Sequence, residues 1–323
     1  MIFNTLTDLV FDDIFLKCSD VLKGSNLFLK LEGFSIGGSI KIKPALKMIN
    51  RLEVSGVITP LSTVIESSSG NLGVALSIIC ASKGYPFTCV ADPNISEISE
   101  KLIKAYGGNV IKVQDKDSNG GYLTSRINRI RDMCKENPLL VWTNQYENID
   151  NIEAHYLSTG ASIIEQFPEI DYLFIGAGTT GTLCGVSKHL YQHNPKIKII
   201  AVDSVGSVTF DGNAGKRVIP GLGASKVPPI SKLAQYDELI RIDESETVNM
   251  CLKMAKKGLM LGGSSGTVLA AIDRYKEQIP EGSTVVVISP DFGERYLNSI
   301  YDEEWNARNF SSLVQVNYKK LFN

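Results

Sequence analysis

The feature that most limits the possible folds of this chain is its alternation of short apolar segments with longer amphipathic ones. The short segments are rich in β-branched and aromatic residues and apolar on both faces, which is typical of strands buried inside a parallel sheet. We expect strands at 27–33, 63–66, 87–92, 109–113, 140–144, 172–178, 197–203, 239–242 and 284–291. We expect helices near 41–53, 70–83, 95–106, 121–135, 151–166, 181–192, 245–257 and 266–277. This alternation predicts an α/β fold with parallel sheets wrapped by helices.

The nine expected strands could form one sheet or divide into two smaller sheets. An asparagine-rich and acidic stretch at 144–156 interrupts the pattern near the middle of the chain, and we expect a domain junction there. A second unusual stretch, 204–233, is rich in glycine and proline. Because connections of that length inside a compact domain usually serve a function, we expect it to lie near a site.

The composition excludes several classes of function. With 33 basic and 35 acidic residues and a formal charge of -2, the chain has no basic excess for nucleic acid. It lacks an apolar run of about 18 residues that could span a membrane, and its acidic N-terminus does not resemble a targeting segment, so we expect a cytoplasmic protein. The six cysteines form no C-x-x-C pair. We expect buried thiols rather than disulfides, and no metal site.

Four loops rich in glycine, serine and threonine each follow an expected strand. They cover residues 33–45, 67–73, 176–182 and 262–267. Ligands of open α/β sheets usually bind beyond the carboxyl ends of the strands. These loops are therefore the candidate binding site.

The loop GAGTTGT at 176–182 has the features of a phosphate cradle. Its glycines expose backbone N–H groups at a helix N-terminus, and Thr179, Thr180 and Thr182 add hydroxyl donors. The spacing of Gly176, Gly178 and Gly181 also fits the dinucleotide fingerprint, with Asp203 as the acidic residue that such sites use to bind ribose. A nicotinamide cofactor and a plain capped turn are therefore alternatives at this loop.

The loop GGSIK at 37–41 places a lysine behind two glycines and a serine. Lysine forms Schiff bases with aldehydes, and burial lowers its pKa toward a reactive amine. Taken alone, Lys41 would more often be a solvated lysine in a first helical turn. Together with the phosphate cradle and a serine–asparagine loop, however, it indicates pyridoxal 5'-phosphate, which needs an amine, a phosphate site and polar partners for its ring.

The ordered motifs GGSIK, SSSGNLG, NQY, GAGTTGT, GGSSG and PDFGERYL resemble the fold-type II pyridoxal-phosphate enzymes of the cysteine synthase and cystathionine β-synthase family. The resemblance covers about residues 27–300. It implies a tryptophan synthase β-like fold with two open, twisted, mostly parallel sheets flanked by helices, and the cofactor in the cleft between two domains. It also implies a larger domain of 1–40 with 150–323, a smaller mobile domain of 41–149, and a homodimer.

The resemblance also implies roles for individual residues. Lys41 would be the Schiff-base lysine and the general base. The other cofactor-binding positions would be Asn71 at the ring hydroxyl, Gly178, Thr179, Thr180, Gly181 and Thr182 at the phosphate, and Ser264 at the pyridine nitrogen. The substrate-binding positions would be Ser67, Ser68, Ser69, Gly70, Leu72, Gln145, Arg126, Tyr146 and Gly221. A solvated helix arginine is the alternative for Arg126.

Within the family, the segments 120–127, 155–160 and 220–228 resemble a branch that works in 2,3-diaminopropionate pathways of siderophore and antibiotic biosynthesis. That branch replaces the phosphate of O-phospho-L-serine by the amine of L-glutamate through an aminoacrylate intermediate, giving N-(2-amino-2-carboxyethyl)-L-glutamate. The alternatives are an O-acetylserine sulfhydrylase or another β-substituted alanine synthase or lyase, a nicotinamide-dependent oxidoreductase, and a non-catalytic sensor that keeps the fold.

The chain departs from the family pattern at four places. Ser35-Ile36 replaces an asparagine–proline pair, and Ile42-Lys43 replaces the aspartate–arginine pair that usually follows the lysine. Leu72 stands where cysteine synthases have threonine, and Gly178 stands where the branch can carry serine. The changes at Leu72 and Gly178 bear on the nucleophile more than on the cofactor. The residues alone do not predict the effect of Ile42-Lys43.

Overall fold

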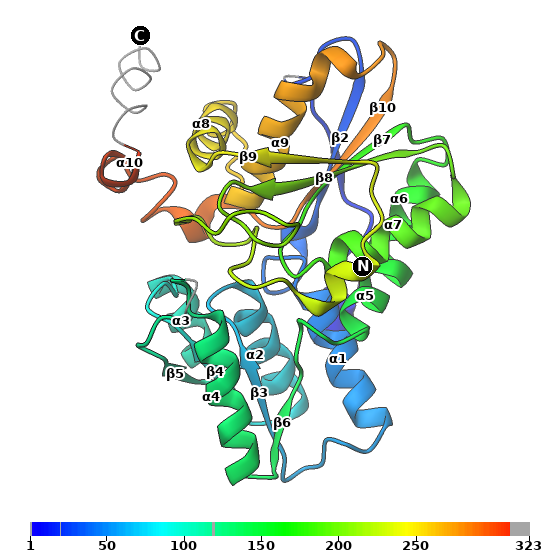
Figure 1. Ribbon diagram of the computed structural model, residues 1–323. Helices are drawn as coiled ribbons and strands as arrows, with labels where there is room; N and C mark the ends of the chain where they lie inside the picture. The colour runs from blue at the N-terminus through cyan, green and yellow to red at the C-terminus, as the bar shows by residue number, and fades with distance from the viewer. Residues whose placement is uncertain (1, 20, 118–119, 311–323) are drawn as a thin grey trace.

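Two β-sheets, one above the other and each covered by helices, make up the fold (Figure 1). The computed structural model describes residues 2–19, 21–117 and 120–310. All strands pair in parallel except for one edge strand of the larger sheet, as the alternation of strand and helix predicts. The expected α/β class is confirmed, and of the two arrangements left open by the sequence, two sheets rather than one is correct.

The larger sheet has six strands and the smaller has four. In spatial order the larger sheet contains β1 (Phe15–Lys17), β2 (Asn26–Leu31), β10 (Thr284–Ser289), β7 (Tyr172–Gly176), β8 (Lys198–Ser204) and β9 (Glu238–Ile242). The smaller sheet contains β5 (Asn109–Lys112), β4 (Phe87–Ala91), β3 (Thr63–Ser67) and β6 (Leu140–Trp142). β10 lies between β2 and β7, so the segments that follow these three parallel strands leave the same edge of the sheet.

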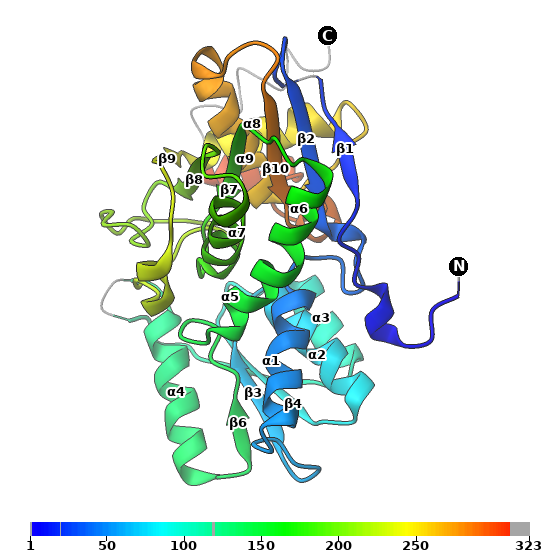
Figure 2. The ribbon, with the colours of Figure 1, turned by 90° about the vertical axis from the view of Figure 1, so that its right-hand side faces the viewer.

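The helices surround both sheets. The α-helices are α1 (Ile42–Val54), α2 (Asn71–Lys83), α3 (Glu97–Ala105), α4 (Leu123–Glu136), α5 (Asp150–His155), α6 (Ala161–Gln166), α7 (Gly181–His193), α8 (Glu244–Ala255), α9 (Gly263–Tyr275) and α10 (Glu303–Asn309). Shorter 3-10 turns are η1 (Leu6–Leu9), η2 (Glu32–Phe34), η4 (Pro229–Leu233), η5 (Lys276–Gln278) and η6 (Gly293–Tyr296), and η3 (Tyr156–Gly160) is a π-helix. α1 and α5 pack together where the two sheets meet, as the turned view shows (Figure 2).

The period of two along each strand divides its side chains between two cores. In β10, Val285 and Val287 belong to the core beneath α8 and α9, whereas Val286 and Ile288 face the core beneath α6 and α7. The smaller sheet is built in the same way. Its β3 and β4 side chains alternate between a core with α1, α2 and α3 and a core with α4. Burial on both faces explains why the strands read as continuous apolar runs.

Most expected elements end within three residues of their observed bounds, and the differences have local causes. β1 was not expected, because it is a three-residue antiparallel edge strand with exposed positions. The single helix expected at 151–166 is three segments, with the π-helix η3 between α5 and α6. α10 also lies beyond the expected helices. The remainder of the C-terminal segment, for which we considered a tail, a final helix or a dimer contact, lies outside the described residues.

The strands of the smaller sheet all lie between 63 and 142, but the proposed domain boundaries stay a prediction. None of the six cysteines forms a disulfide, and five are buried, as expected. None of the described helices is long and apolar enough to cross a membrane.

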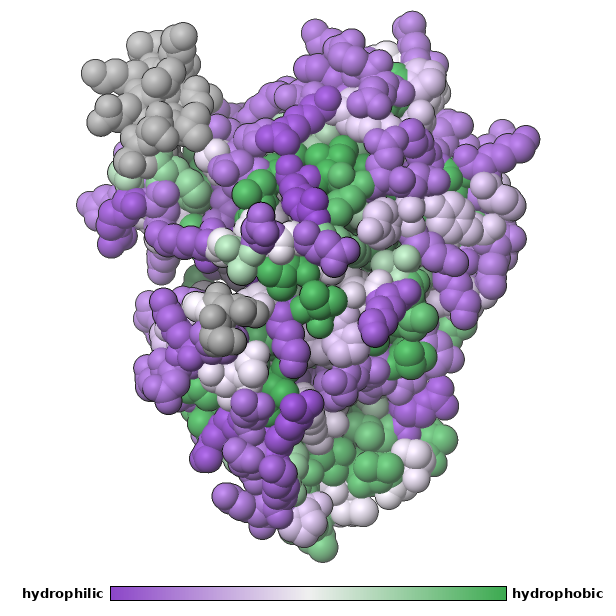
Figure 3. Space-filling model, viewed as in Figure 1, coloured by the Kyte–Doolittle hydropathy of each residue, from purple (hydrophilic) through white to green (hydrophobic). Residues whose placement is uncertain are grey.

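The face of the molecule in Figure 3 is largely hydrophilic with scattered hydrophobic areas, which is ordinary for a protein surface.

Candidate active site

The predicted loops come together at one edge of the larger sheet and above the smaller one. The segments after β2, β10 and β7 leave neighbouring parallel strands, and the backbone joins two of them, since Ile40 N donates to Pro290 O at 2.8 Å. One expectation was wrong: loop 262–267 follows no strand. It follows Leu261, which forms an isolated bridge to Phe292 and so reaches the same edge.

Lys41 lies at the start of α1, where it is half-buried. Desolvation lowers the pKa of its amine to about 8, and the charge of Asp291 opposes part of that effect. Its amine forms no hydrogen bond within the described parts of the chain. An amine that is neutral in part near pH 8 and has no partner is chemically suited to react with a carbonyl group or to accept a proton.

Asn71, the first residue of α2, is bonded to the segment that follows β10. Its Nδ2 donates to Asp291 Oδ2 at 2.7 Å, and its Oδ1 accepts from Arg295 Nη1. Tyr296 Oη also donates to Asp291 Oδ2, at 2.6 Å. Asp291 is fully buried, and Arg295 reaches the carbonyl of Gly37 in the lysine loop. Sequence reasoning matched the 290–297 segment but did not assign these two residues a role.

The three serines of the 67–73 loop differ in their partners. Ser68 Oγ accepts from the backbone N–H groups of Gly70 and Gly73, so it caps the start of α2. Ser69 Oγ donates to Asp92 Oδ2 at 2.8 Å and accepts from Arg126 Nη1 at 3.1 Å. Ser67 ends β3, is buried, and its Oγ has no hydrogen-bond partner among the described residues.

Arg126 is not the solvated helix arginine that we considered as an alternative. It is buried on α4 and pairs with Asp92, with Nε 3.3 Å from Oδ2. It also lies close enough to Tyr146 for its charge to lower the pKa of that phenol, which burial raises. Asp92 therefore balances the charge of Arg126, and the guanidinium binds Ser69 of the serine loop while lying close to Tyr146.

Glu66 organises this side of the site, although no sequence motif pointed to it. Its fully buried carboxylate accepts from Ser67 N, Trp142 Nε1, Thr143 Oγ1 and Gln145 N. Gln145 in turn donates from Nε2 to Ser67 O at 3.0 Å. Burial raises the pKa of Glu66, and these four hydrogen bonds oppose that rise. Glu66 thus fixes Gln145 against the serine loop, while Leu72 and Gly70 lie at the adjoining start of α2.

The glycine loop 176–182 joins β7 to α7 with little room for side chains. A Cβ at Gly178 would lie 2.7 Å from Gly221 O, and one at Gly181 would lie 2.3 Å from Asn151 Oδ1. Thr180 has a φ of 70°, a conformation that is uncommon for residues other than glycine and clusters at functional sites. Asn151 donates to Thr179 Oγ1 at 3.2 Å and to Gln145 O at 2.8 Å. Asn151, which sequence reasoning missed, therefore holds two of the predicted segments together.

Ser264 and Gly221 lie beside each other near this loop. A Cβ at Gly221 would be 3.7 Å from Ser264 Cβ, and Gly221 has a φ of 111° that favours glycine. Ser264 lies in the first turn of α9, is buried, and forms no side-chain hydrogen bond to any described residue. The geometry brings Ser264, Gly221 and Gly178 into one neighbourhood, and their separate predicted roles at the ring nitrogen, the substrate and the phosphate stay predictions.

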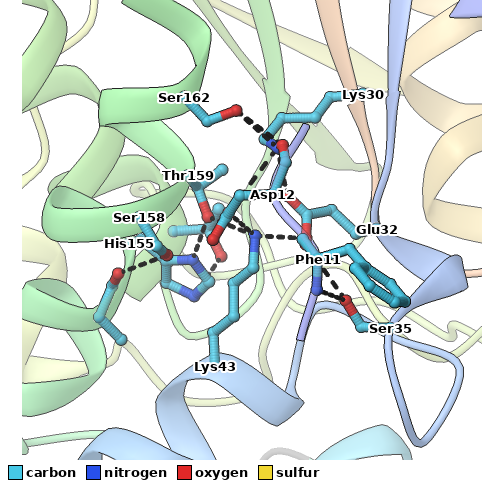
Figure 4. Close-up of polar contacts among 12 residues, drawn as sticks. Phe11, Asp12, Lys30, Glu32, Ser35, Lys43, His155, Ser158, Thr159 and Ser162 are labelled. Carbon is cyan, nitrogen blue, oxygen red and sulfur yellow. Dashed lines mark hydrogen bonds and ion pairs between the residues drawn. The ribbon is translucent and has the colours of Figure 1, made fainter. Parts of the chain in front are cut away.

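A buried ionic cluster surrounds Lys43, two residues after Lys41 in the chain (Figure 4). Lys43 pairs with Asp12 and with Glu32, whose Oε2 is 2.6 Å from Nζ, and Lys30 pairs with Glu32 at 3.3 Å. Lys30, Glu32 and Lys43 are almost fully buried. Lys43 therefore anchors α1 to η2 and the N-terminal segment, which accounts for the unusual lysine two residues after Lys41.

These residues fit pyridoxal 5'-phosphate. The cofactor needs an amine, an anion cradle and a polar group for the ring nitrogen. Lys41 provides an unbonded amine, and the loop before α7 provides backbone N–H groups in a space that a Cβ would fill. Ser264 provides a buried hydroxyl with no other partner in the described structure. The individual binding roles stay predictions.

Asp203 does not suit the role that a nicotinamide cofactor would give it. It is fully buried at the end of β8, where its Oδ1 accepts from Ser204 N at 2.8 Å. Burial raises the pKa of its carboxyl, while Arg217 and Arg241 are close enough to lower it in part. Asp203 therefore supports the 204–233 segment from inside rather than facing a ribose.

Comparisons with known proteins agree with the geometry. Residues 15–291 match the family described as "Pyridoxal-phosphate dependent enzyme". The chain is 42% identical over 286 residues to N-(2-amino-2-carboxyethyl)-L-glutamate synthase of Ralstonia nicotianae, covering 88% of this chain and 85% of that protein. It is 41% identical over 289 residues to the enzyme of the same name in Cupriavidus metallidurans, with the same coverage. The crystal structure of O-acetylserine dependent cystathionine β-synthase from Helicobacter pylori superposes with a TM-score of 0.87 at 29% identity, covering 94% of this chain and all of that one.

Proposed function

The chain belongs to the pyridoxal-phosphate dependent enzyme family, and on this premise we propose that it replaces the phosphate of O-phospho-L-serine by the amine of L-glutamate. The observation that carries the reaction type is Lys41, a half-buried amine with a pKa of about 8, in a fold that also provides an anion cradle at 176–182. The choice of substrates is supported by the two relatives that share 42% and 41% of their residues over 88% of the chain. The product would be a precursor of 2,3-diaminopropionate, as used in siderophore or antibiotic biosynthesis.

Pyridoxal 5'-phosphate, when bound, supplies an aldehyde for amino groups and a ring that accepts electrons from the α carbon. Lys41 would bind that aldehyde in the resting enzyme. Its free amine would then take the proton from the α carbon of the amino-acid substrate. A pKa near 8 suits this task, because an effective general base titrates near the working pH.

The start of α2 would hold the carboxylate of the first substrate. Backbone N–H groups at a helix N-terminus favour an anion, and Ser68 already keeps this turn in place. Ser67 Oγ is buried and lacks a partner among the described residues, so it is available to a ligand. Gln145 is fixed beside Ser67 through Glu66, which prepares its amide for the same carboxylate.

A small pocket lined by Tyr146 carries positively charged side chains, which would attract an amine with two carboxylates. It lies between α4 and residues 226–229. Arg131 and Lys226 are among its lining residues and supply two positive charges, although Glu147 offsets one of them. Tyr146 lines this pocket and lies within range of the charge of Arg126, which binds Ser69 of the serine loop. We propose that L-glutamate approaches from this pocket and that the smaller unit, 41–149, closes over both substrates and keeps water out.

The test is to incubate the holoenzyme with O-phospho-L-serine and L-glutamate and to measure phosphate release and the coupled product by mass spectrometry. Sustained release of phosphate beyond one equivalent per site only when both substrates are present, with formation of the coupled product, would support the proposal. Absence of both would reject it. The competing reaction is of the O-acetylserine type, which the likeness to the Helicobacter pylori enzyme favours. O-acetyl-L-serine with sulfide is therefore assayed in parallel, and faster turnover of that pair would replace the proposal.

The assembly is a separate proposal. We carry the homodimer over from the family resemblance, and sedimentation velocity tests it directly. A single species near twice 35.3 kDa would support the dimer, and a species of 35.3 kDa at micromolar concentration would contradict it.

A further inference from the structure

A buried chain of hydrogen bonds connects the ionic cluster around Lys43 to the glycine loop. Lys43 Nζ is 3.3 Å from Thr159 Oγ1, and Thr159 Oγ1 is 3.1 Å from His155 Nδ1. The other ring nitrogen, His155 Nε2, is 3.2 Å from Thr182 Oγ1 at the start of α7. Figure 4 shows Lys43, Thr159 and His155 pointing toward one another from α1, η3 and α5. His155 and Thr159 are completely buried, so solvent takes no part in these contacts.

The chemistry of the groups fixes the direction of each bond. Lys43 is paired with Asp12 and Glu32, and an ammonium group can only donate, so Thr159 Oγ1 accepts from it. Within the described structure, the remaining partner of Thr159 Oγ1 is His155 Nδ1, which therefore accepts the hydroxyl proton. A neutral imidazole that accepts at Nδ1 carries its proton on Nε2. That N–H donates to Thr182 Oγ1, and the proton of Thr182 is left to point into the loop.

The surroundings keep the imidazole neutral, as this arrangement requires. Burial lowers the pKa of His155 well below its ordinary value, and the positive charges of Lys41, Lys43 and Lys30 lower it further. Thr159 belongs to a π-helix, a rare element that is often found at functional sites.

We propose that His155 is a positioning residue: through Nε2–H it keeps the Thr182 hydroxyl turned as a donor toward the phosphate group held by residues 176–182. The proposal rests on the phosphate role of that loop and not on the identity of the two substrates. His155 itself touches neither the cofactor nor the reacting atoms, and Thr159 and Lys43 determine which of its nitrogens carries the proton.

The first test observes the tautomer in the unmodified protein. The chain has three histidines, so ¹⁵N-histidine NMR of the holoenzyme gives few signals, and comparison with His155→Gln assigns the relevant pair. We expect a proton on Nε2 and a bare Nδ1 from pH 6 to 8. A proton on Nδ1, or an imidazolium that carries both protons, would overturn the proposal.

The second test measures the rate at which the holoenzyme loses pyridoxal phosphate to a scavenging apoenzyme. His155→Gln places an amide N–H close to the position of Nε2, whereas His155→Asn reaches only the position of Nδ1. We expect His155→Asn and Thr182→Val each to speed cofactor loss about tenfold, the effect of losing one hydrogen bond to a charged group, and His155→Gln to change it much less. In a Thr182→Val background, His155→Asn should add nothing further.

Several results would count against the proposal. Equal effects of His155→Gln and His155→Asn, or additive effects of His155→Asn and Thr182→Val, would show that His155 only supports folding. An unchanged rate in Thr182→Val would show that the hydroxyl is not a phosphate donor. Failure to couple O-phospho-L-serine with L-glutamate, with normal cofactor retention, would reject the proposed substrates and not this inference.

Discussion

Asn71 is bonded to Asp291 across the two halves of the molecule, with Nδ2 donating to Oδ2 at 2.7 Å. Asn71 begins a helix that covers the smaller sheet, and Asp291 follows the central strand of the larger one. The charge of Asp291 also acts on Lys41. One buried carboxylate therefore couples the helix that carries the serine loop to the reactive lysine, and any movement between the halves must keep or break this bond.

Asp291→Asn should lower the pKa of Lys41 below its value of about 8. The carboxylate stabilises the protonated amine, so its removal leaves desolvation unopposed. Competitive acetylation of the cofactor-free chain across pH 6–10, read by mass spectrometry of the Lys41 peptide, measures this pKa. Glu294→Gln is the control, because it removes an exposed carboxylate from the same segment. An equal shift in both variants would contradict the role of Asp291.

Lys41→Met should stabilise the cofactor-free chain at pH 7. The folded-state pKa of about 8 lies below the ordinary 10.5, so the unfolded chain binds more protons between these values and wild-type stability rises with pH across that window. The cost of burying the charged amine is thus fully present below pH 8 and fades toward pH 10.5. Urea unfolding at pH 7 and pH 9.5 should show a gain that narrows with pH. Lys101→Met, at an exposed lysine, should show no such gain.

The features of the fold that could be predicted are those that depend on residues close together in the sequence. Strand and helix periodicity in β10 and α7 is carried by consecutive residues, and so both were found. The division into two sheets depends on pairing between distant segments such as β2 and β10, which no local pattern encodes. The π-helix at Tyr156–Gly160 has too few residues to disturb the helical pattern around it.

The loops of the candidate site could be predicted from the sequence, but the residues that hold these loops in place could not. The loops 37–41, 67–73 and 176–182 are rich in glycine, serine and threonine. Small residues are needed where the backbone of a loop packs closely against a ligand or a neighbouring segment, so such loops can be recognised from composition. Glu66, Asn151 and Asp291 act through tertiary contacts, and each lies in a segment that reads as an ordinary strand end or helix start. The crowding of serines at 67–69 also has a partly structural cause, since Ser68 caps α2 and Ser69 binds Asp92.

Glu66→Gln should destabilise the protein by about 2–3 kcal/mol. The two oxygens of Glu66 accept four hydrogen bonds. An amide –NH₂ in place of Oε1 would face two N–H donors, and in place of Oε2 it could donate to Thr143 Oγ1 but would still face the N–H of Gln145. Urea unfolding at pH 7 measures the loss. Glu165→Gln, at an exposed helix position, should change the free energy of unfolding by less than about 0.5 kcal/mol. Similar values for the two variants would mean that the Glu66 network contributes little.

Lys43→Met should cost about 3–5 kcal/mol of stability, since breaking a buried ion pair leaves charges uncompensated. Glu32 and Lys43 are almost fully buried, and among the described residues Glu32 would keep Lys30 alone as a cationic partner. Lys47→Met is the matched control on the same helix, because its pair with Glu153 is partly exposed and should be worth less than about 1 kcal/mol. Lys43→Arg keeps the charge and should lose less than Lys43→Met. If Lys43→Met and Lys47→Met unfolded at the same urea concentration, the ionic cluster would not be what anchors α1, and the lysine after Lys41 would need another explanation.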